Sequence, residues 1–468
     1  MKKGRENLCK AVILCFWLVV WQMLAAGIGH SILFAGPVQV IGKLVQLLVT
    51  SDFWKVLLCS TGRILSGILL AFVMGTGLGI LSAFFPWLEK FLQIPVNVLQ
   101  AIPVACYAVL LLIWYGSDPL TVMITFVIVF PNLYFQTMAG IRDVDESLLE
   151  MAEVYHFCPG DKALYLYRPA MHSHIRGAAQ SAVGNAWKAG VAAEIIGLPS
   201  WSIGERIYMA KVYLNTAELF AWTAALVCVS WIMGGLLLKL LDRVFTMPVV
   251  GKRPGGCAPP ESFDRWNLQV TDLRKSYGEK SLWGEQPLNC TFRGGGTYAL
   301  MAPSGAGKTT LFRILAGLET PDAGWVNWER EAPLGGTKET PDIAIAFEEK
   351  RFVENLTLED NLKLVGISWE TVKQDCLELL SEEELRKPLS QYSLGMGHRA
   401  EVLRCMLSPA SVLLLDEPFN GMDETMRKKA AEFIKKRKKG RLLLCITHKR
   451  EEAALLQAEI LKKNWNFS

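Results

Sequence analysis

Nine residues near position 305 have the types and spacing of a phosphate-binding loop. The stretch Ala302-Pro-Ser-Gly-Ala-Gly-Lys-Thr-Thr310 follows an apolar strand pattern at Thr297–Met301 and precedes a helical pattern at Leu311–Leu318. A strand, a glycine-rich loop and a helix in this order are the context that a P-loop requires. The sequence therefore predicts a site for the phosphates of a nucleotide.

The loop residues have distinct expected roles. Gly305 and Gly307 allow backbone N–H groups to turn inward around phosphates, and the following helix N-terminus adds a favourable dipole. Lys308 supplies a positive charge to the β- and γ-phosphates, and the Thr309 hydroxyl can ligate Mg²⁺. The usual first glycine is Ala302 here. The predicted nucleotide-binding residues are Ser304, Gly305, Ala306, Gly307, Lys308, Thr309 and Thr310.

Two carboxylates and a histidine follow apolar strand patterns farther along the chain. The run Ser411–Leu415 is typical of a buried parallel strand and ends in Asp416 and Glu417. An aspartate at a strand end suits a Mg²⁺ site, and the next carboxylate is positioned to polarise an attacking water. A second run, Leu442–Thr447, ends in His448, which we expect to sense the γ-phosphate.

These residues resemble the ATP-binding cassette of ABC transporters, and the match runs from about Leu268 to the C-terminus. By that resemblance Lys308 and Thr309 belong to the Walker A motif, and Asp416 and Glu417 to Walker B with its catalytic carboxylate. The resemblance implies an α/β P-loop fold that hydrolyses ATP with Mg²⁺.

Other cassette motifs are placed by the same resemblance. Phe419-Asn-Gly-Met-Asp423 is similar to the D-loop, which assigns Asp423 to the nucleotide site, and His448 is similar to the switch histidine. Tyr277 lies where the family stacks an aromatic ring on adenine. A packed tyrosine at a strand end is the alternative interpretation of Tyr277.

The sequence departs from the family pattern at two motifs. The signature LSGGQ is Tyr392-Ser-Leu-Gly-Met396 here, which keeps Ser393 and Gly395 but has Leu394 at the first glycine. The glutamine of the Q-loop falls on Glu348, whose carboxylate could reach Mg²⁺ or water but adds negative charge beside phosphate. A membrane scaffold or sensor with a degenerate, weakly hydrolysing cassette is therefore a second hypothesis.

Charge is unevenly distributed along the chain. Residues 1–250 carry 17 basic and 14 acidic side chains, whereas residues 251–468 carry 32 and 31. The first part is suited to membrane lipid and the second to water, which excludes a wholly soluble enzyme and a disulfide-rich secreted domain. The net charge of +4 gives no argument for a nucleic-acid partner.

Apolar runs of about 20 residues predict membrane-spanning helices. We expect six spans, at Ala11–Ile28, Ile64–Leu88, Phe91–Ser117, Pro119–Ile141, Gly177–Gly197 and Leu219–Leu238. A cleaved signal peptide is the alternative for the first run, whose length favours an uncleaved anchor. The expected domains are an all-α six-span permease domain at 1–247, a linker at 248–264 and the cassette at 265–468.

Basic residues predict the orientation. Lys2, Lys3 and Arg5 precede the first span, so we expect a cytoplasmic N-terminus by the positive-inside rule. Six crossings return the chain to the cytoplasm at the cassette, and the connection at 142–176 is cytoplasmic as well. Within the fifth span, Glu194 either belongs to a substrate path or faces a cavity or interface with Lys188 and orients the helix.

The 142–176 connection resembles the EAA loop of bacterial importer permeases. Glu150, Met151 and Ala152 fall on its EAA residues, and Pro169 falls on its later proline, while the loop glycine is replaced by His156. The resemblance implies that Glu150, Met151 and Ala152 couple the membrane domain to the cassette, near the segment of Glu348.

Residues from about Gly36 to Val244 are similar to the permeases of the nitrate/sulfonate/taurine family of importers. The resemblance implies a fused permease–ATPase half-transporter in the bacterial cytoplasmic membrane, where a homodimer takes up a small solute from an extracytoplasmic solute-binding protein. Nitrate, sulfonates, taurine and vitamin precursors are all open as solutes. A half-size exporter is the alternative transporter.

Overall fold

The computed structural model describes residues 2–29, 32, 34–246, 260, 262–278, 280–283, 286–303, 305–331 and 340–461. These residues form two compact units. The first comprises Met1–Asp143 with Tyr167–Met247, and the second comprises Val144–Leu166 with Pro248–Ser468. Most of the expected linker, including 248–259, lies outside the described residues.

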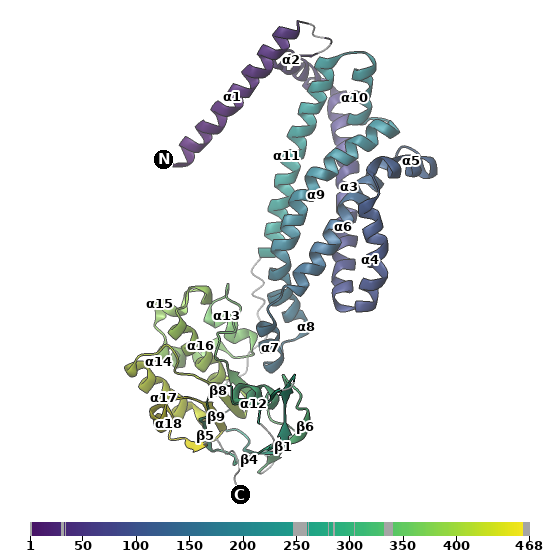
Figure 1. Cartoon of the computed structure of the whole chain (residues 1–468). Coiled ribbons are helices and arrows are strands. Elements are labelled where there is room, and N and C mark those ends of the chain that lie inside the picture. Colours follow the sequence, from purple (N-terminus) through teal and green to yellow (C-terminus); the bar gives the residue numbers. More distant parts are fainter. Residues whose placement is uncertain are drawn as a thin grey trace. The chain divides into compact units, whose positions relative to one another are not determined.

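The first unit is entirely helical in its described residues (Figure 1). Its helices are α1 (Lys2–Ile28), α2 (Pro37–Leu48), α3 (Ser51–Phe84), α4 (Pro86–Ala101), α5 (Val104–Tyr115), α6 (Leu120–Arg142), α9 (Arg168–Gly197), α10 (Ile203–Val212) and α11 (Thr216–Thr246).

Small residues allow the long helices to pack closely. Gly67, Gly75 and Gly79 of α3 face α6, and a Cβ added to Gly79 would lie 2.8 Å from the Tyr134 carbonyl oxygen. Because the residues on this face of α3 have no side chain, the backbones of α3 and α6 approach each other closely. A core that includes Ile64, Leu133 and Trp187 then joins α3, α6 and α9.

The third expected span, Phe91–Ser117, is a broken helix. The axes of α4 and α5 differ in direction by 102°. The break falls at Ile102 and Pro103, where Ile102 is extended with ψ 130°. Proline lacks an N–H donor and disfavours a helical conformation of the residue before it, so an apolar run is not one continuous helix here.

Three helices in the described residues are long and apolar enough to cross a membrane, namely α3, α6 and Thr216–Phe245 of α11, and the bent pair α4–α5 makes a fourth if it is one span. Within the described residues, Cys15–Ile28 of α1 is a shorter apolar helix. The lengths and compositions of the described helices thus do not reproduce the expected six membrane spans, and this number stays a prediction.

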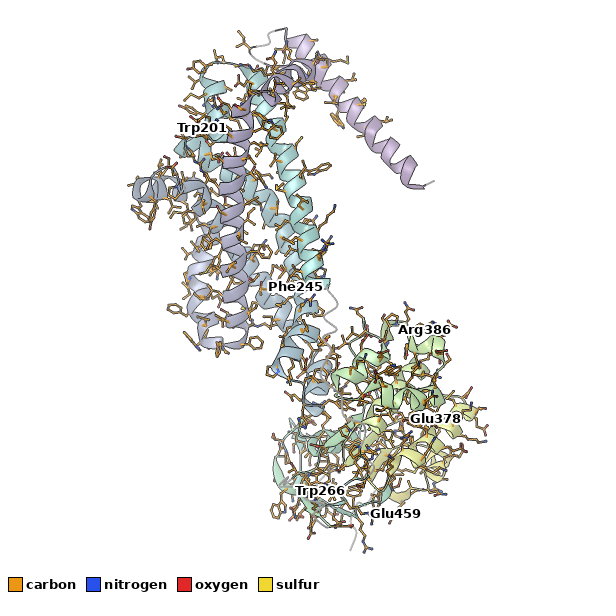
Figure 2. The ribbon with its side chains drawn as sticks, turned by 180° about the vertical axis from the view of Figure 1, so that it is seen from behind. Trp201, Phe245, Trp266, Glu378, Arg386 and Glu459 are labelled. Atoms are coloured by element: carbon orange, nitrogen blue, oxygen red, sulfur yellow. The ribbon has the colours of Figure 1, made fainter. Side chains whose placement is uncertain are left out.

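The second unit is the cassette, with a five-stranded parallel sheet in the order β10-β5-β9-β8-β7 and a three-stranded antiparallel sheet in the order β4-β1-β6. Its strands are β1 (Trp266–Arg274), β2 (Ser276–Tyr277), β3 (Lys280–Ser281), β4 (Leu288–Phe292), β5 (Thr297–Leu300), β6 (Ala323–Arg330), β7 (Ile343–Ala346), β8 (Val412–Asp416), β9 (Leu442–Ile446) and β10 (Glu459–Leu461). Trp266 at the start of β1 and Glu459 at the start of β10 are labelled in Figure 2.

Helices cover the sheets of the cassette. They are α12 (Lys308–Leu315), α13 (Leu358–Leu364), α14 (Trp369–Leu379), α15 (Glu382–Leu385), η2 (Leu389–Gln391), α16 (Leu394–Leu407), α17 (Glu424–Lys438) and α18 (Arg450–Leu455). The central strands β8 and β9 are buried along their whole length, which explains their unbroken apolar sequences.

The segment Val144–Leu166 belongs to the cassette unit, although the sequence places all of 1–247 in the membrane domain. It contains α7 (Glu146–Val154), α8 (Pro159–Asp161) and most of the π-helical turn η1 (Lys162–Tyr167). Met151 and Ala152 are fully buried in the core of the cassette, which is the physical reason for the difference.

Candidate functional site

The phosphate-binding loop connects β5 to α12 as the sequence predicts. Gly305 and Gly307 have φ angles of 79° and 80°, a left-handed conformation in which a side chain is strained. Gly307 is the N-cap of α12 and Lys308 is its first residue. The backbone N–H groups at this helix start therefore have the arrangement that binds anions. Ser304 lies outside the described residues.

The ammonium group of Lys308 is held over the loop. Its Nζ donates to the carbonyl oxygens of Ala302 at 2.6 Å and Pro303 at 3.2 Å. Burial lowers the pKa of Lys308, and three nearby carboxylates act in the opposite direction. The charge thus lies where phosphate oxygens would approach the loop.

Asp416 ends β8 beside the first turn of α12. Its Oδ2 accepts a hydrogen bond from the Thr309 hydroxyl at 3.0 Å. Burial raises the pKa of Asp416 to about 7, and the charges of Glu348 and Glu417 act in the same direction. An added positive charge would therefore stabilise the ionised form of this carboxyl group.

The Thr309–Asp416 pair fits Mg²⁺ by its donor atoms. Magnesium prefers oxygen ligands and is commonly bound by one or two carboxylates together with phosphate oxygens of the substrate. Within the described residues, no group of three or more His, Cys, Asp or Glu side chains is arranged to hold a metal ion by itself. The phosphates would have to complete the set of ligands.

Glu417, the residue directly after β8, has a strained backbone. Its φ is 45°, and its N–H donates to the Ile446 carbonyl oxygen at 3.1 Å, which fixes the residue to the end of β9. Its Oε1 lies 3.0 Å from Nε2 of His448. Residues in sparsely populated backbone conformations of this kind cluster at functional sites.

A cavity of about 210 Å³ brings most of the predicted residues together. It is lined by Leu282, Gly305, Ala306, Gly307, Lys308, Thr309, Thr310, Glu348, Asp416, Glu417, Ile446 and His448. Glu348, which follows β7, contributes a third carboxylate beside Asp416 and Glu417. One lysine and three carboxylates in this cavity leave an excess of negative charge that a divalent cation would offset.

Four of the predicted nucleotide-site residues that the structure describes do not line this cavity. Ser393 is the N-cap of α16, Gly395 lies in the first turn of that helix, and Asp423 is the N-cap of α17. The side chain of Leu394, between the two signature residues, is 62% exposed. Tyr277 is also exposed, and its hydroxyl donates to Glu319. This tyrosine is therefore not packed in the core.

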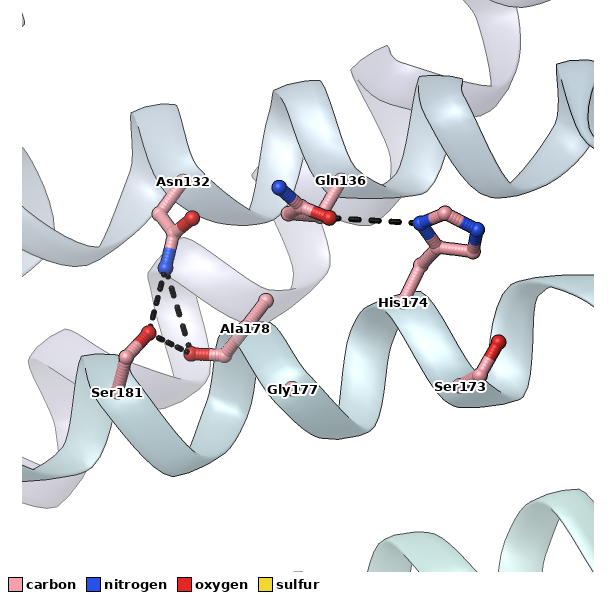
Figure 3. Close-up of a pocket in the computed structure, with 7 residues that line it drawn as sticks. All are labelled: Asn132, Gln136, Ser173, His174, Gly177, Ala178 and Ser181. Carbon is pink, nitrogen blue, oxygen red and sulfur yellow. Dashed lines mark hydrogen bonds between the residues drawn. The ribbon is translucent and has the colours of Figure 1, made fainter.

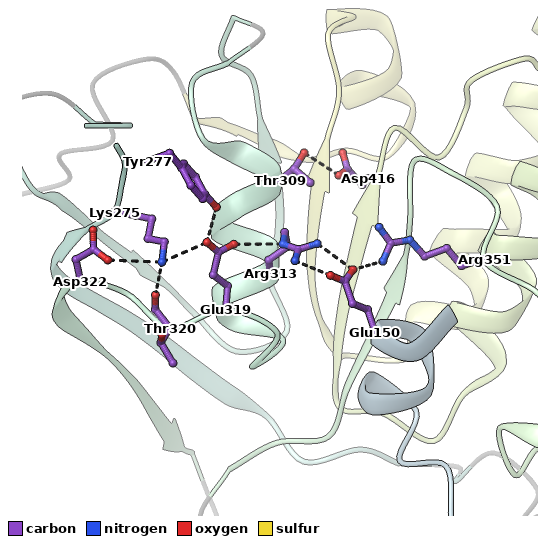
Figure 4. Close-up of polar contacts among 10 residues, drawn as sticks. All are labelled: Glu150, Lys275, Tyr277, Thr309, Arg313, Glu319, Thr320, Asp322, Arg351 and Asp416. Atoms are coloured by element: carbon purple, nitrogen blue, oxygen red, sulfur yellow. Dashed lines mark hydrogen bonds and ion pairs between the residues drawn. The ribbon is translucent and has the colours of Figure 1, made fainter. Parts of the chain in front are cut away.

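Glu150 forms ion pairs with two arginines that no local sequence pattern indicates (Figure 4). Its two carboxylate oxygens accept hydrogen bonds from Arg313 at 2.6 and 2.9 Å, and Oε2 also accepts one from Arg351 at 2.5 Å. Burial tends to raise the pKa of Glu150, but the two guanidinium groups outweigh it and the pKa is lowered. Arg351 comes three residues after Glu348, in the region where docking is expected.

A turn in the same segment uses a histidine where the resembled loop has glycine. His156 has a φ of 50°, and the Phe157 N–H donates to the Ala152 carbonyl oxygen at 2.8 Å, which closes the end of α7. Histidine tolerates the left-handed region better than branched residues do. The turn is therefore formed without the glycine.

Family comparisons match both parts of the chain. Residues 286–420 match the ABC transporter family, and residues 75–246 match the binding-protein-dependent transport system inner membrane component.

Individual relatives match the cassette. The lantibiotic transport ATP-binding protein SrtF of Streptococcus pyogenes is 32% identical over 160 residues, which is 33% of this chain and 68% of that protein. The sulfate/thiosulfate import ATP-binding protein CysA 2 of Rhizobium meliloti is 31% identical over 210 residues, which is 42% of this chain and 56% of that protein. The chain thus spans about half to two thirds of the length of these relatives.

Solved structures also match the cassette. An ATP-binding cassette in a dimeric post-hydrolysis state with ADP and Pi shares 23% identity at a TM-score of 0.36, covering 42% of this chain and 95% of that one. An ATP-binding subunit of an ABC transporter shares 25% identity at a TM-score of 0.36, covering 42% and 86%.

We predict that Glu417→Gln lowers nucleotide hydrolysis at least about a hundredfold while nucleotide binding is retained, because the amide keeps the shape but cannot accept a proton. Phosphate release and binding of a fluorescent ATP analogue measure the two effects. Glu424→Gln is the control, because Glu424 is exposed and accepts a hydrogen bond from Lys428. Equal turnover in the wild-type chain and in Glu417→Gln would contradict this role.

Proposed function

Because this chain belongs to the ABC transporter family, we propose that it uses ATP hydrolysis to take up a small solute across the bacterial cytoplasmic membrane. A permease region and a transport ATPase are fused in one chain. The match of residues 75–246 to inner membrane components of binding-protein-dependent systems supports uptake, because such systems receive their solute from a separate binding protein.

The docking of α7 is the observation that carries the proposal. This helix lies within the sequence of the permease, yet Glu150, Met151 and Ala152 contact the cassette. The contact supports a coupling role for these three residues, and it matches the expected function of the EAA-like loop. The contact between α7 and the cassette forms without a long intracellular helix such as exporters have.

The positions of the nucleotide-site residues support the following roles. The backbone of 305–310 and Lys308 bind the phosphates of ATP. Thr309 and Asp416 would hold Mg²⁺, which would supply positive charge to the phosphates, and Glu348 lies in the same cavity, where it would add a ligand or orient water. Glu417 accepts a proton from the attacking water, and His448 orients Glu417 and the γ-phosphate. Tyr277 stacks on the adenine ring.

A second copy of the chain completes each ATP site. Ser393, Gly395 and Asp423 do not line the cavity that holds Lys308 in the same chain. A homodimer with two shared sites gives these residues a nucleotide to contact, and it supplies the second half of the translocation path. Closed two-fold symmetry is the commonest arrangement for such assemblies.

The membrane topology in this proposal has six crossings. They are α1, α3, the bent pair α4–α5, α6, α9 and α11. The N-terminus, the α7 segment and the cassette lie in the cytoplasm, and the solute-binding protein docks on the opposite side. Basic residues at both ends of this region support the orientation.

One feature favours a degenerate, weakly hydrolysing cassette as a second candidate. The apolar side chain of Leu394 is exposed at a signature position where the family has glycine. Glu348 also adds a negative charge to the cavity. A membrane scaffold or sensor would bind ATP but show wild-type turnover no higher than Glu417→Gln.

The direction of transport can be measured without knowing the solute. Cells that express the chain with its binding protein should accumulate a small molecule that cells with Glu417→Gln do not, as followed by mass spectrometry of cells and medium. Uptake predicts depletion of that molecule from the medium. Enrichment of a molecule in the medium would instead establish an exporter.

We predict that Glu150→Ala lowers uptake of this molecule by about five- to a hundredfold while ATP hydrolysis continues, because coupling free energies between sites are of this size. Glu153→Ala on the exposed face of α7 is the matched control. Glu150→Ala combined with Arg351→Ala should be no worse than Glu150→Ala alone. Full uptake by Glu150→Ala would show that the ion pairs do not couple ATP hydrolysis to solute uptake.

A complementation experiment tests the shared ATP sites. Lys308→Ala and Ser393→Arg should each abolish hydrolysis in a homodimer. When the two variants are co-expressed, mixed dimers contain one site with an intact Lys308 and an intact Ser393, so we expect partial recovery of hydrolysis. No recovery in purified mixed dimers would mean that both residues act within one chain.

A further inference from the structure

The exposed face of α9 differs from the exposed faces of the other long helices in the membrane unit. Every exposed residue between positions 173 and 188 is polar, charged or glycine. These residues are Ser173, Arg176, Gly177, Gln180, Ser181, Gly184, Asn185 and Lys188. We call this surface the polar face of α9. The opposite side of the helix is buried and apolar, with Ala182, Ala186 and Trp187.

The helices α3 and α11 expose apolar side chains instead. Leu69 of α3 is 66% exposed, and Trp231 of α11 is 86% exposed. Apolar side chains of this size are suited to lipid, whereas polar and charged groups in lipid are unfavourable unless they find partners or water. The polar face of α9 is therefore suited to water. This composition explains why α9 is not among the helices that are apolar enough by themselves to indicate a membrane span.

A groove lies toward the N-terminal end of α9 on this face, against α6 (Figure 3). It has a volume of about 310 Å³ and is lined by Asn132, Gln136, Ser173, His174, Gly177, Ala178 and Ser181. Asn132 donates to the Ser181 hydroxyl at 3.0 Å, and His174 Nδ1 lies 3.4 Å from Gln136 Oε1. Among the described residues, the Gln136 amide nitrogen has no hydrogen-bond partner, so it can serve a solute.

Charge on the polar face is positive. Arg176 is paired with Asp242 at 2.9 Å, whereas Lys188 makes no ion pair within the described part of the chain. The acidic residue of α9 is Glu194, which is buried and accepts hydrogen bonds from the Ser60 hydroxyl and the Gly204 N–H. Glu194 thus links α9 to α3 and α10 and does not neutralise Lys188 by a direct contact.

We propose that the polar face of α9 lines the solute path, that the α6–α9 groove contacts the solute through hydrogen bonds, and that Lys188 gives the path a preference for small anions. This inference rests on the proposed transport function. The helical rise places Lys188 about 10 Å from Ser181 along α9, within the range of a charge effect in a water-filled path.

Charged thiol reagents test the proposal without a known solute. Ser181→Cys is nearly isosteric, and the chain in lipid nanodiscs is treated with an anionic or a cationic methanethiosulfonate. Labelling of each cysteine is read by mass spectrometry of its peptide. The native Cys228, exposed on α11, is the internal control for a lipid-facing thiol. Gly184→Cys is a second variant, because nothing lies within 4 Å of a Cβ added at Gly184.

We expect both reagents to label the thiol at position 181 or 184 and to leave Cys228 unlabelled. Adding Lys188→Gln should lower the ratio of anionic to cationic labelling rates about fivefold. Lys90→Gln removes an equal charge from the exposed side of α4 and should leave the ratio unchanged.

Two results would overturn the proposal. Protection of both introduced thiols from both reagents would show that lipid or a second copy covers the polar face. If Lys188→Gln leaves the ratio of anionic to cationic labelling rates unchanged, this lysine does not set the charge preference. Uptake and ATP hydrolysis are measured on the chain without these substitutions, so a failure of the proposed transport function is distinguished from a failure of this inference.

Discussion

The ion pairs of the Glu150 carboxylate join a segment of the permease sequence to the elements of the predicted nucleotide site, and the proposed coupling between the two depends on them. It binds Arg313 through both oxygens and Arg351 through one. Arg313 lies on α12, the helix that starts with Lys308 of the phosphate-binding loop, and Arg351 follows the strand-end segment of Glu348. One side chain therefore contacts both elements that line the predicted nucleotide cavity. A displacement of either element changes the surroundings of Glu150 directly.

The contact extends to the signature helix through a buried network. Glu401 on α16 accepts a hydrogen bond from the Arg351 N–H at 2.8 Å, and the Arg404 guanidinium donates to the Arg351 carbonyl oxygen at 2.5 Å. The same guanidinium lies 4.8 Å from the ring centroid of Tyr155, just after α7. Glu401 and Arg404 are almost completely buried, so removing one of them would leave an uncompensated charge. This network ties α7 to the helix that begins at the signature.

The sequence predicts the nucleotide site far better than it predicts the docking contact. A P-loop and strand-end carboxylates follow from local patterns, because each motif sits at a fixed place in a strand–loop–helix unit. Arg313 and Arg351 are 163 and 201 residues from Glu150, and no local periodicity relates positions so far apart. The prediction of the membrane helices is incomplete for a different reason, because hydropathy detects only apolar composition. It therefore does not indicate the break at Pro103. It also gives a weak signal for α9, because the exposed face of this helix is polar.

Ion pairs alone do not explain why α7 docks. Exposed pairs contribute about 0–1 kcal/mol each, and the pairs of Glu150 are only partly buried. Met151 and Ala152 add buried apolar area, and the Tyr155 hydroxyl donates to the Ile345 carbonyl oxygen of β7 at 2.9 Å. Fusion of the permease and the cassette in one chain also makes docking an intramolecular event, which raises the effective concentration of α7 at the cassette. A contact that is formed within one chain can be modest in strength and still be populated throughout. Under the proposed coupling, modest strength suits a contact whose partners shift when nucleotide binds.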